Sequence, residues 1–172
     1  MRLVFWTGFW VFLADQATKY VVVQWLDLAA RLRIDVLPPY LSFRMAWNRG
    51  VNFGLFSGAD MRWVLIGVAL AISAVVLYWV WRDGGSRWAQ ASAGLLIGGA
   101  LGNVVDRLLY GAVADFLNMT CCGIENPYAF NIADIAIFAG AIGLIVFTGD
   151  GKSKRPARRR PAGRGKPANK TP

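Results

Sequence analysis

Four apolar segments, each long enough to cross a lipid bilayer, constrain this chain more than any other feature. A membrane-spanning helix needs about 20 residues, because each residue adds about 1.5 Å along the axis and the hydrocarbon core is about 30 Å thick. The segments are residues 3–26, 63–81, 88–105 and 128–148. The first continues past Asp15 without an evident cleavage site, which favours an uncleaved span over a signal peptide. The sequence therefore predicts an α-helical integral membrane protein with four transmembrane helices.

The positive charge of the chain is concentrated in residues 149–172. This segment holds nine basic residues and one acidic residue, whereas the other 148 residues hold ten basic and nine acidic. It contains no large apolar residue, so it cannot bury enough surface to fold. We therefore expect a membrane domain over residues 1–148 and a disordered basic tail that binds anionic lipid rather than nucleic acid.

The distribution of Lys and Arg also predicts the orientation in the membrane. Arg2, the connection 82–87 and the basic tail hold twelve basic residues, and the segment 27–62 holds five. Cytoplasmic segments carry the excess of basic residues in membrane proteins. Both termini are therefore expected in the cytoplasm, and residues 27–62 and 106–127 are expected on the outer side.

The outer segment 27–62 has the pattern of a β-strand. Apolar side chains alternate with other residues from Leu41 to Trp47, residues 48–50 are typical of a turn, and the alternation resumes over 51–55. We expect a small sheet or hairpin on the outer face of the membrane.

The residue types that are missing exclude several classes of site. The chain has no His, which excludes a Ser-His-Asp triad, a Cys-His dyad and a His-ligated zinc site. Its two cysteines, Cys121 and Cys122, are adjacent and cannot form a disulfide framework. Catalysis by this chain must then depend on carboxylates, Lys, Ser or the cysteine pair.

Four aspartates lie in the apolar segments or at their ends: Asp15, Asp106, Asp115 and Asp134. Ionisable side chains are costly in lipid and commonly serve a function there. Asp115 follows the outer end of the third span, and Asp134 lies six residues inside the fourth. Two carboxylates that share a proton provide a general acid and a general base, which together activate water. The spacing permits this pairing but equally permits structural roles for both residues.

Structural roles are open for the other polar residues in the spans. Asp15 and Lys19 have the four-residue spacing of an ion pair on one helix face. An interfacial pair could form between Asp106 and Arg107. Hydrogen bonds between helices could be made by Asn103 and Asn131.

Three other functions compete with an aspartate-based enzyme. They are a proton-coupled transporter, a membrane serine protease with Lys19 as the base, and a membrane tether that recruits a partner through its basic tail. No inverted repeat supports the transporter. Asp15 would keep Lys19 charged, and a charged amine cannot act as the base of a serine protease. A tether leaves the four aspartates unexplained.

Four motifs occur in order along the chain: DQATK (15–19), WNRGVNFGLF (47–56), GGALGNVVDRLLYGAVADF (98–116) and FNIADIAI (130–137). Together they resemble the bacterial lipoprotein signal peptidase family, also called signal peptidase II. The resemblance covers residues from about 5 to 148 and excludes the basic tail.

The resemblance implies an aspartyl endopeptidase of the bacterial inner membrane, with its active site at the periplasmic face. Such an enzyme removes the signal peptide of a prolipoprotein just before a Cys that carries diacylglycerol. The family pattern implies four helices, a small outer sheet and an amphipathic segment over the site. It requires no metal and no organic cofactor, and we expect a monomer.

The motifs also assign residues. Asp115 and Asp134 match the catalytic pair, and Asp15 and Lys19 would give structural support. The matches expected to bind substrate or support the site are Asn48, Gly50, Asn103, Asp106, Arg107 and Asn131.

Two single residues and one pair of cysteines depart from the family pattern. Asn52 and Ile135 stand where smaller residues are frequent, and the pair Cys121–Cys122 belongs to none of the motifs.

Overall fold

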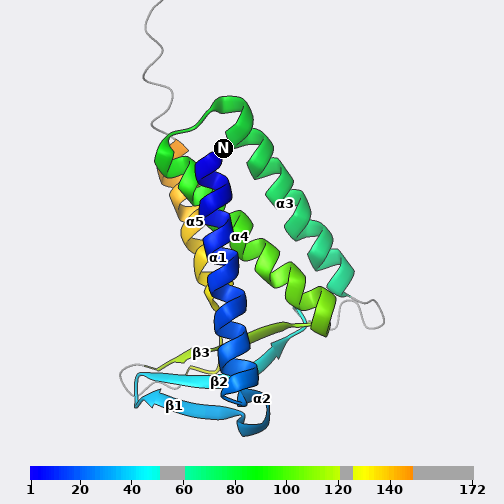
Figure 1. Ribbon diagram of the computed structural model, residues 1–172, viewed down its shortest axis with the longest axis vertical. Helices are drawn as coiled ribbons and strands as arrows, with labels where there is room; N and C mark the ends of the chain where they lie inside the picture. The colour runs from blue at the N-terminus through cyan, green and yellow to red at the C-terminus, as the bar shows by residue number, and fades with distance from the viewer. Residues whose placement is uncertain (51–60, 121–125, 149–172) are drawn as a thin grey trace, which may run out of the picture.

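The computed structural model describes residues 1–50, 61–120 and 126–148. The helices stand side by side, and a three-stranded antiparallel sheet lies across their lower ends (Figure 1). The long helices are α1 (Arg2–Lys19), α3 (Met61–Asp83), α4 (Arg87–Tyr110) and α5 (Ile132–Thr148). The strands are β1 (Arg33–Leu37), β2 (Leu41–Asn48) and β3 (Val113–Met119). The chain is thus mostly helical with one small sheet, as the sequence predicts.

Helix α4 is the centre of the helical layer, because it packs against α1, α3 and α5. Two helices among the described residues, α3 and α4, are long and apolar enough to cross a membrane. Helix α5 is apolar but has only 17 residues. Helix α3 exposes apolar side chains such as Val68 and Ile72, which is the surface expected of a helix in lipid.

The first predicted span is one continuous helical segment. Helix α1 passes into a π-helix, η1 (Tyr20–Trp25), so the helical backbone extends from Arg2 to Trp25. A short helix α2 (Leu28–Arg31) follows and leads into the sheet. It is flanked by Asp27 and Leu32, both in left-handed conformations, which turn the chain at the end of the span.

Two other helices differ from the predicted apolar segments. Helix α4 extends beyond residue 105 to Tyr110, where Gly111 adopts a φ of 75° and donates its N–H to the Arg107 carbonyl. Helix α5 begins at Ile132 rather than at 128, because Phe130 forms a β-bridge with Leu117. Asp134 therefore lies in the first turn of α5 and not six residues inside it.

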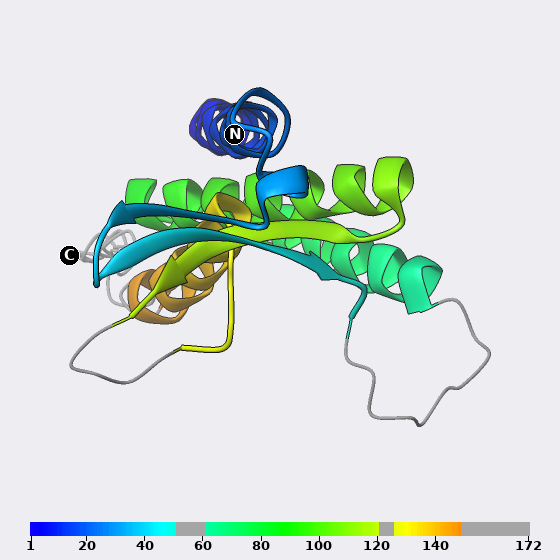
Figure 2. The ribbon, with the colours of Figure 1, turned by 90° about the horizontal axis from the view of Figure 1, so that it is seen from below.

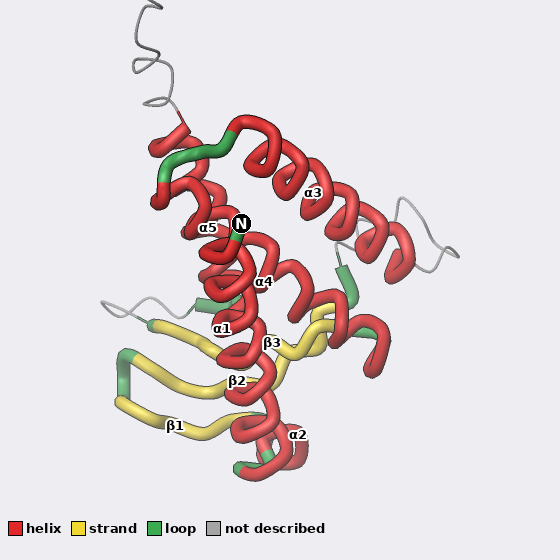
Figure 3. The backbone as a smooth tube through the Cα atoms, turned by 45° about the horizontal axis from the view of Figure 1, so that its top comes forward, coloured by secondary structure: helices red, strands yellow, loops and turns green. Residues whose placement is uncertain are grey.

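Strand β2 confirms the strand that the sequence predicts over residues 41–47, but burial does not follow the alternation throughout, because Ser42 is buried and Trp47 is exposed. The proposed continuation over 51–55 lies outside the described residues. The partners of β2 are β1 and β3, with Phe43 opposite Ile34 and Ala46 opposite Asp115. The strand β3 comes from the connection 106–127, for which no strand was predicted. Figure 2 shows the three strands crossing the ends of the helices, and Figure 3 shows the same two layers by element type.

Close backbone contact joins α1 to α4. A Cβ atom added at Gly98 would overlap the backbone of Gly8, and one added at Gly94 would lie 2.7 Å from the Val4 carbonyl oxygen. Small residues at such crossings let helices approach closely in a membrane.

We expect Gly98→Ala to lower the thermal stability of the protein in detergent, because the new methyl group must push α1 away from α4. Overpacking of this kind costs about 1–3 kcal/mol. The matched control is Gly67→Ala in α3, where an added Cβ meets nothing within 4 Å. Equal melting temperatures for the two variants would contradict the close crossing.

Candidate active site

Asn131 lies between two carboxylates that come from different elements. Asp115 lies in β3 and Asp134 in the first turn of α5. The side-chain amide of Asn131 donates to Asp115 Oδ1 at 2.6 Å, and its backbone N–H donates to Asp134 Oδ2 at 3.2 Å. The fold thus brings together the two aspartates that the sequence paired.

The start of α5 explains why Asn131 holds this position. Its Oδ1 accepts the backbone N–H of Asp134 at 2.9 Å, while the Asp134 carboxylate accepts the backbone N–H of Asn131. This reciprocal pattern is a capping box, which satisfies two N–H groups that the first helical turn leaves without partners. The same residues therefore begin the helix and orient its carboxylate.

Asn48 binds the other oxygen of Asp115. It lies at the end of β2 and donates from Nδ2 to Asp115 Oδ2 at 3.0 Å. Its Oδ1 accepts the backbone N–H of Gly50 at 2.9 Å, which turns the amide nitrogen toward the carboxylate. Gly50 has a φ of 98°, a conformation that residues with a side chain rarely adopt, so a larger residue would be strained at this position.

Asn103 and Arg107 approach Asp134 from α4. Asn103 donates from Nδ2 to Asp134 Oδ1 at 2.9 Å. One turn later, Arg107 donates to the Asn103 carbonyl at 3.2 Å. The Nε atom of Arg107 is buried and has no hydrogen-bond partner among the residues that the structure describes. A donor of this kind is available to a bound substrate.

A buried ion-pair cluster lies behind Asn103. Lys19 is 2.7 Å from Asp15 and 2.7 Å from Asp106, and both carboxylates are almost fully buried. The ion pair expected between Asp15 and Lys19 is therefore present. The ion pair of Asp106 is with Lys19 and not with Arg107, because neighbouring residues of a helix point roughly 100° apart.

Gln16 lies within the DQATK motif and also belongs to this cluster, although it is not among the predicted site residues. Its Nε2 is 3.1 Å from an oxygen of Asp15 and 3.1 Å from an oxygen of Asp106. The two carboxylates also accept backbone N–H groups near the candidate site, Asp15 from Ala133 and Asp106 from Ala114. The cluster thus ties α1 and α4 to the elements that carry Asp134 and Asp115.

The environment of Asp115 favours its protonated form. Burial raises the pKa of the Asp115 carboxyl from its usual 3.8 to about 6, and the charge of Asp134 acts in the same direction. Hydrogen bonds from Asn48 and Asn131 and the charge of Lys19 oppose this increase. Two neighbouring carboxylates of which one keeps its proton can serve as a general acid and a general base.

This pKa predicts how stability changes with pH. The folded protein binds the Asp115 proton more tightly than the unfolded chain does, so this stabilisation is complete below pH 4 and is lost as the pH rises through about 6. The loss amounts to about 3 kcal/mol at most. We expect the unfolding free energy of the wild type to fall relative to that of Asp115→Asn between pH 4 and pH 7. Chemical denaturation in detergent measures the difference, and a constant difference across this range would contradict the assignment.

The structure describes only one of the residues that depart from the family pattern. Ile135 is exposed on α5, and Asn52 and the pair Cys121–Cys122 lie outside the described residues.

Comparisons with known proteins identify the family. The profile of the family described as Signal peptidase (SPase) II matches residues 7–148. Two relatives carry the name lipoprotein signal peptidase. The Methylobacterium sp. (strain 4-46) protein is 44% identical over 87% of this chain and 90% of its own length, and the Burkholderia mallei (strain SAVP1) protein is 39% identical over 78% and 80%.

Solved structures agree with the sequence comparison. A structure described as a bacterial membrane enzyme at 2.3 Å resolution has a TM-score of 0.71 and 26% identity, and the match covers 92% of this chain and 96% of that one. A second, at 1.9 Å resolution, has a TM-score of 0.74 and 28% identity over 85% and 92%. The resemblance seen in the four motifs is thereby confirmed, and the chain belongs to the signal peptidase II family of aspartic peptidases.

Proposed function

We propose that Asp115 and Asp134 are the catalytic dyad of an endopeptidase that removes signal peptides from diacylglyceryl-modified prolipoproteins, cleaving before the lipidated Cys. The observation that carries this proposal is the bridge through Asn131, which binds both carboxylates. The names of the relatives support the substrate class, since they are lipoprotein signal peptidases.

Each carboxylate of the dyad accepts two hydrogen bonds, so the raised pKa of Asp115 is the observation that separates their roles. Asp134 accepts one bond from the Asn103 amide and one from a backbone N–H, which suits an ionised general base. Asp115 has a raised pKa, which suits the group that holds the proton. Asp134 takes a proton from water as the water oxygen attacks the peptide carbonyl carbon, and Asp115 gives its proton to the carbonyl oxygen. Collapse of this gem-diol intermediate breaks the C–N bond as Asp134 gives the proton that it took from water to the leaving amine. One hydroxyl of the intermediate returns a proton to Asp115, which restores both carboxyl groups to their starting states.

The residues around the dyad provide substrate contacts. The buried Nε of Arg107 would donate to a substrate carbonyl or to the developing oxyanion. Asn48 and Gly50 lie at the end of β2, next to Asp115, and would contact the substrate backbone there. This chemistry uses only side chains and water, with no metal or organic cofactor.

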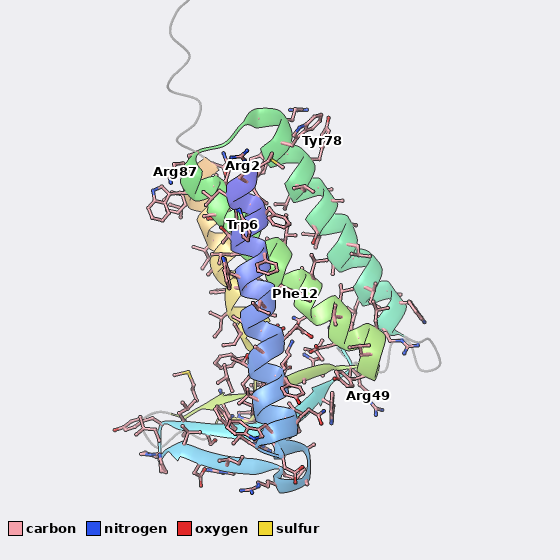
Figure 4. All side chains as sticks on the ribbon, in the orientation of Figure 1. Arg2, Trp6, Phe12, Arg49, Tyr78 and Arg87 are labelled. Carbon is pink, nitrogen blue, oxygen red and sulfur yellow. The ribbon has the colours of Figure 1, made fainter. Side chains whose placement is uncertain are left out.

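The membrane arrangement is part of the proposal. We infer that the four long helices span the bacterial inner membrane, with both termini in the cytoplasm and the sheet at the periplasmic face. Arg2 and Arg87 lie at one end of the helices and Arg49 at the other (Figure 4), which supports this orientation. The dyad then lies at the outer boundary of the bilayer, and an amphipathic segment would cover it.

A lipid anchor on the substrate suits this position. Diacylglycerol holds the scissile bond at the depth of the dyad, which raises its effective concentration without many protein contacts. The enzyme is proposed to act as a monomer.

The test is cleavage of a purified diacylglyceryl-modified prolipoprotein in detergent, followed by mass shift. The same polypeptide without the lipid serves as the substrate control. Cleavage immediately before the Cys of the lipidated form alone would support the proposal. Folded wild-type protein that cleaves neither form would overturn it.

Residues 149–172 lie outside the described residues, and we propose that they form a disordered cytoplasmic tail that binds anionic lipid. Deletion of residues 152–172 is expected to leave the cleavage rate within about twofold of the wild type, because the tail lies across the membrane from the dyad. It should weaken binding of the protein to vesicles that contain anionic lipid. A stable truncated protein without activity would contradict this placement.

A further inference from the structure

The buried ammonium of Lys19 makes three polar contacts, and they are not equivalent. Two go to the carboxylates of Asp15 and Asp106 at 2.7 Å. The third is a hydrogen bond from Nζ to Asn103 Oδ1 at 3.3 Å. Charge compensation explains the first two contacts but not the third. The third contact connects α1 to Asn103, which donates a hydrogen bond to Asp134.

The contact with Asn103 determines which end of its amide faces the dyad. Asn103 Oδ1 accepts from Lys19 and also from the Asn131 amide at 3.3 Å. Its Nδ2 therefore points the other way and donates to Asp134 Oδ1 at 2.9 Å. A flipped amide would place an oxygen against the Asp134 carboxylate and an NH₂ group against the ammonium, and both contacts are repulsive.

We propose that Lys19 is a positioning residue of the peptidase: through Asn103, it fixes the hydrogen-bond donor that faces Asp134. Among the described residues, Lys19 forms no hydrogen bond or ion pair with either carboxylate of the dyad. Its charge lowers the pKa of Asp115 from a distance, whereas its hydrogen bond acts on Asp134 through one intermediate side chain, Asn103. This role is separate from the support that the Asp15–Lys19 ion pair gives to helix packing. It rests on the proposed function of Asp134 as the general base.

The test must remove the donor without leaving buried charges unpaired. Lys19→Met alone leaves Asp15 and Asp106 without a cation, so it tests folding as much as positioning. The informative variant is the neutral triad, in which Lys19→Met is combined with Asp15→Asn and Asp106→Asn. An Asn at each position still has an oxygen to accept the N–H groups of Ala133 and Ala114.

A double-mutant cycle between the neutral triad and Asn103→Ala isolates the proposed connection. We expect each variant to lower kcat by about 10- to 100-fold, with KM within about twofold, because the base loses its fixed donor but the substrate contacts remain. The combined variant should have the kcat of the slower single variant, since both remove the same interaction. The melting temperature and the size-exclusion profile show whether each variant is folded. The value of kcat is calculated per mole of folded protein.

The control variant is Gln16→Met. Gln16 contacts Asp15, Asp106 and the Gly102 carbonyl, so its loss loosens the same cluster without touching the Asn103 side chain. We expect it to lower the melting temperature and to leave kcat within about twofold of the wild type.

Two results would overturn the positioning role. The first is a folded neutral triad with the kcat of the wild type, and the second is a combined variant whose loss equals the product of the two single losses. If the neutral triad does not fold, the same cycle is measured with Lys19→Met combined with Asp106→Asn alone. This pair removes the donor and leaves Asp15 with its hydrogen bonds from Gln16 and Ala133, and the same two results decide. Asp134→Asn is measured in parallel: normal turnover there refutes the proposed function, whereas an inactive Asp134→Asn beside a fully active neutral triad refutes only the role of Lys19.

Discussion

Replacement of Asp115 by Asn is expected to lower kcat for prolipoprotein cleavage by about 10²- to 10⁴-fold. An Asn at this position keeps an oxygen to accept the Asn131 amide, but it has no carboxyl proton to give to the peptide carbonyl. Asp134→Asn should cause a loss of the same size, since the amide cannot take a proton from water. The measurement is single-turnover cleavage of the lipidated substrate with excess enzyme, followed by mass shift.

The matched control for this prediction is Asp35→Asn. Asp35 lies in β1 of the same sheet and forms an exposed ion pair with Arg33 at 2.8 Å. Exposed pairs contribute about 0–1 kcal/mol to stability, so the control should fold and cleave like the wild type. Near-normal turnover by a folded Asp115→Asn or Asp134→Asn protein would refute the dyad.

Asn131→Ala is expected to damage both stability and catalysis. Removal of the side chain deletes the cap of α5 and the donor to the buried Asp115 carboxylate. A lost cap costs about 1 kcal/mol, and a buried acceptor left without its donor costs about 1–3 kcal/mol, so we expect the unfolding free energy to fall by about 3 kcal/mol. The kcat should fall by about 10²-fold, because the side chain that fixes Asp115 and the start of α5 is gone.

Asn126→Ala is the control for this second prediction. Asn126 lies in the same segment before α5, and within the described part of the chain its side chain accepts only the backbone N–H of Tyr128. We expect a small loss of stability and normal turnover from this variant. If Asn131→Ala and Asn126→Ala had the same unfolding free energy and the same kcat, the bridge between the two carboxylates would contribute nothing to stability or catalysis.

The sequence by itself determined the elements whose pattern is local. Apolar residues over 63–81 predicted α3, and the alternation from Leu41 to Trp47 predicted β2. The four ordered motifs identified the family, and they marked Asp115 and Asp134 as the residues to examine. Each of these signals lies within a short stretch of chain, where helix and strand periodicities are visible directly.

The end points of two helices and the third strand could not be read in this way. Strand β3 carries the VADF motif, but its partner β2 lies about 70 residues earlier, and no local pattern pairs the two. Helix α5 starts at Ile132 because Asn131 caps it and Phe130 pairs with Leu117.

The tertiary structure alone decided which polar groups meet at the site. Asp15 accepts a backbone N–H from a residue 118 positions away, and Lys19 contacts Asn103 across 84 positions. Sequence spacing paired Asp15 with Lys19 and placed two carboxylates near one boundary, but it did not assign the hydrogen-bond partners of either carboxylate. Those partners come from β2, α4 and the residue that caps α5. They meet because a buried polar group must find a partner wherever packing places one, and packing is determined by the whole fold.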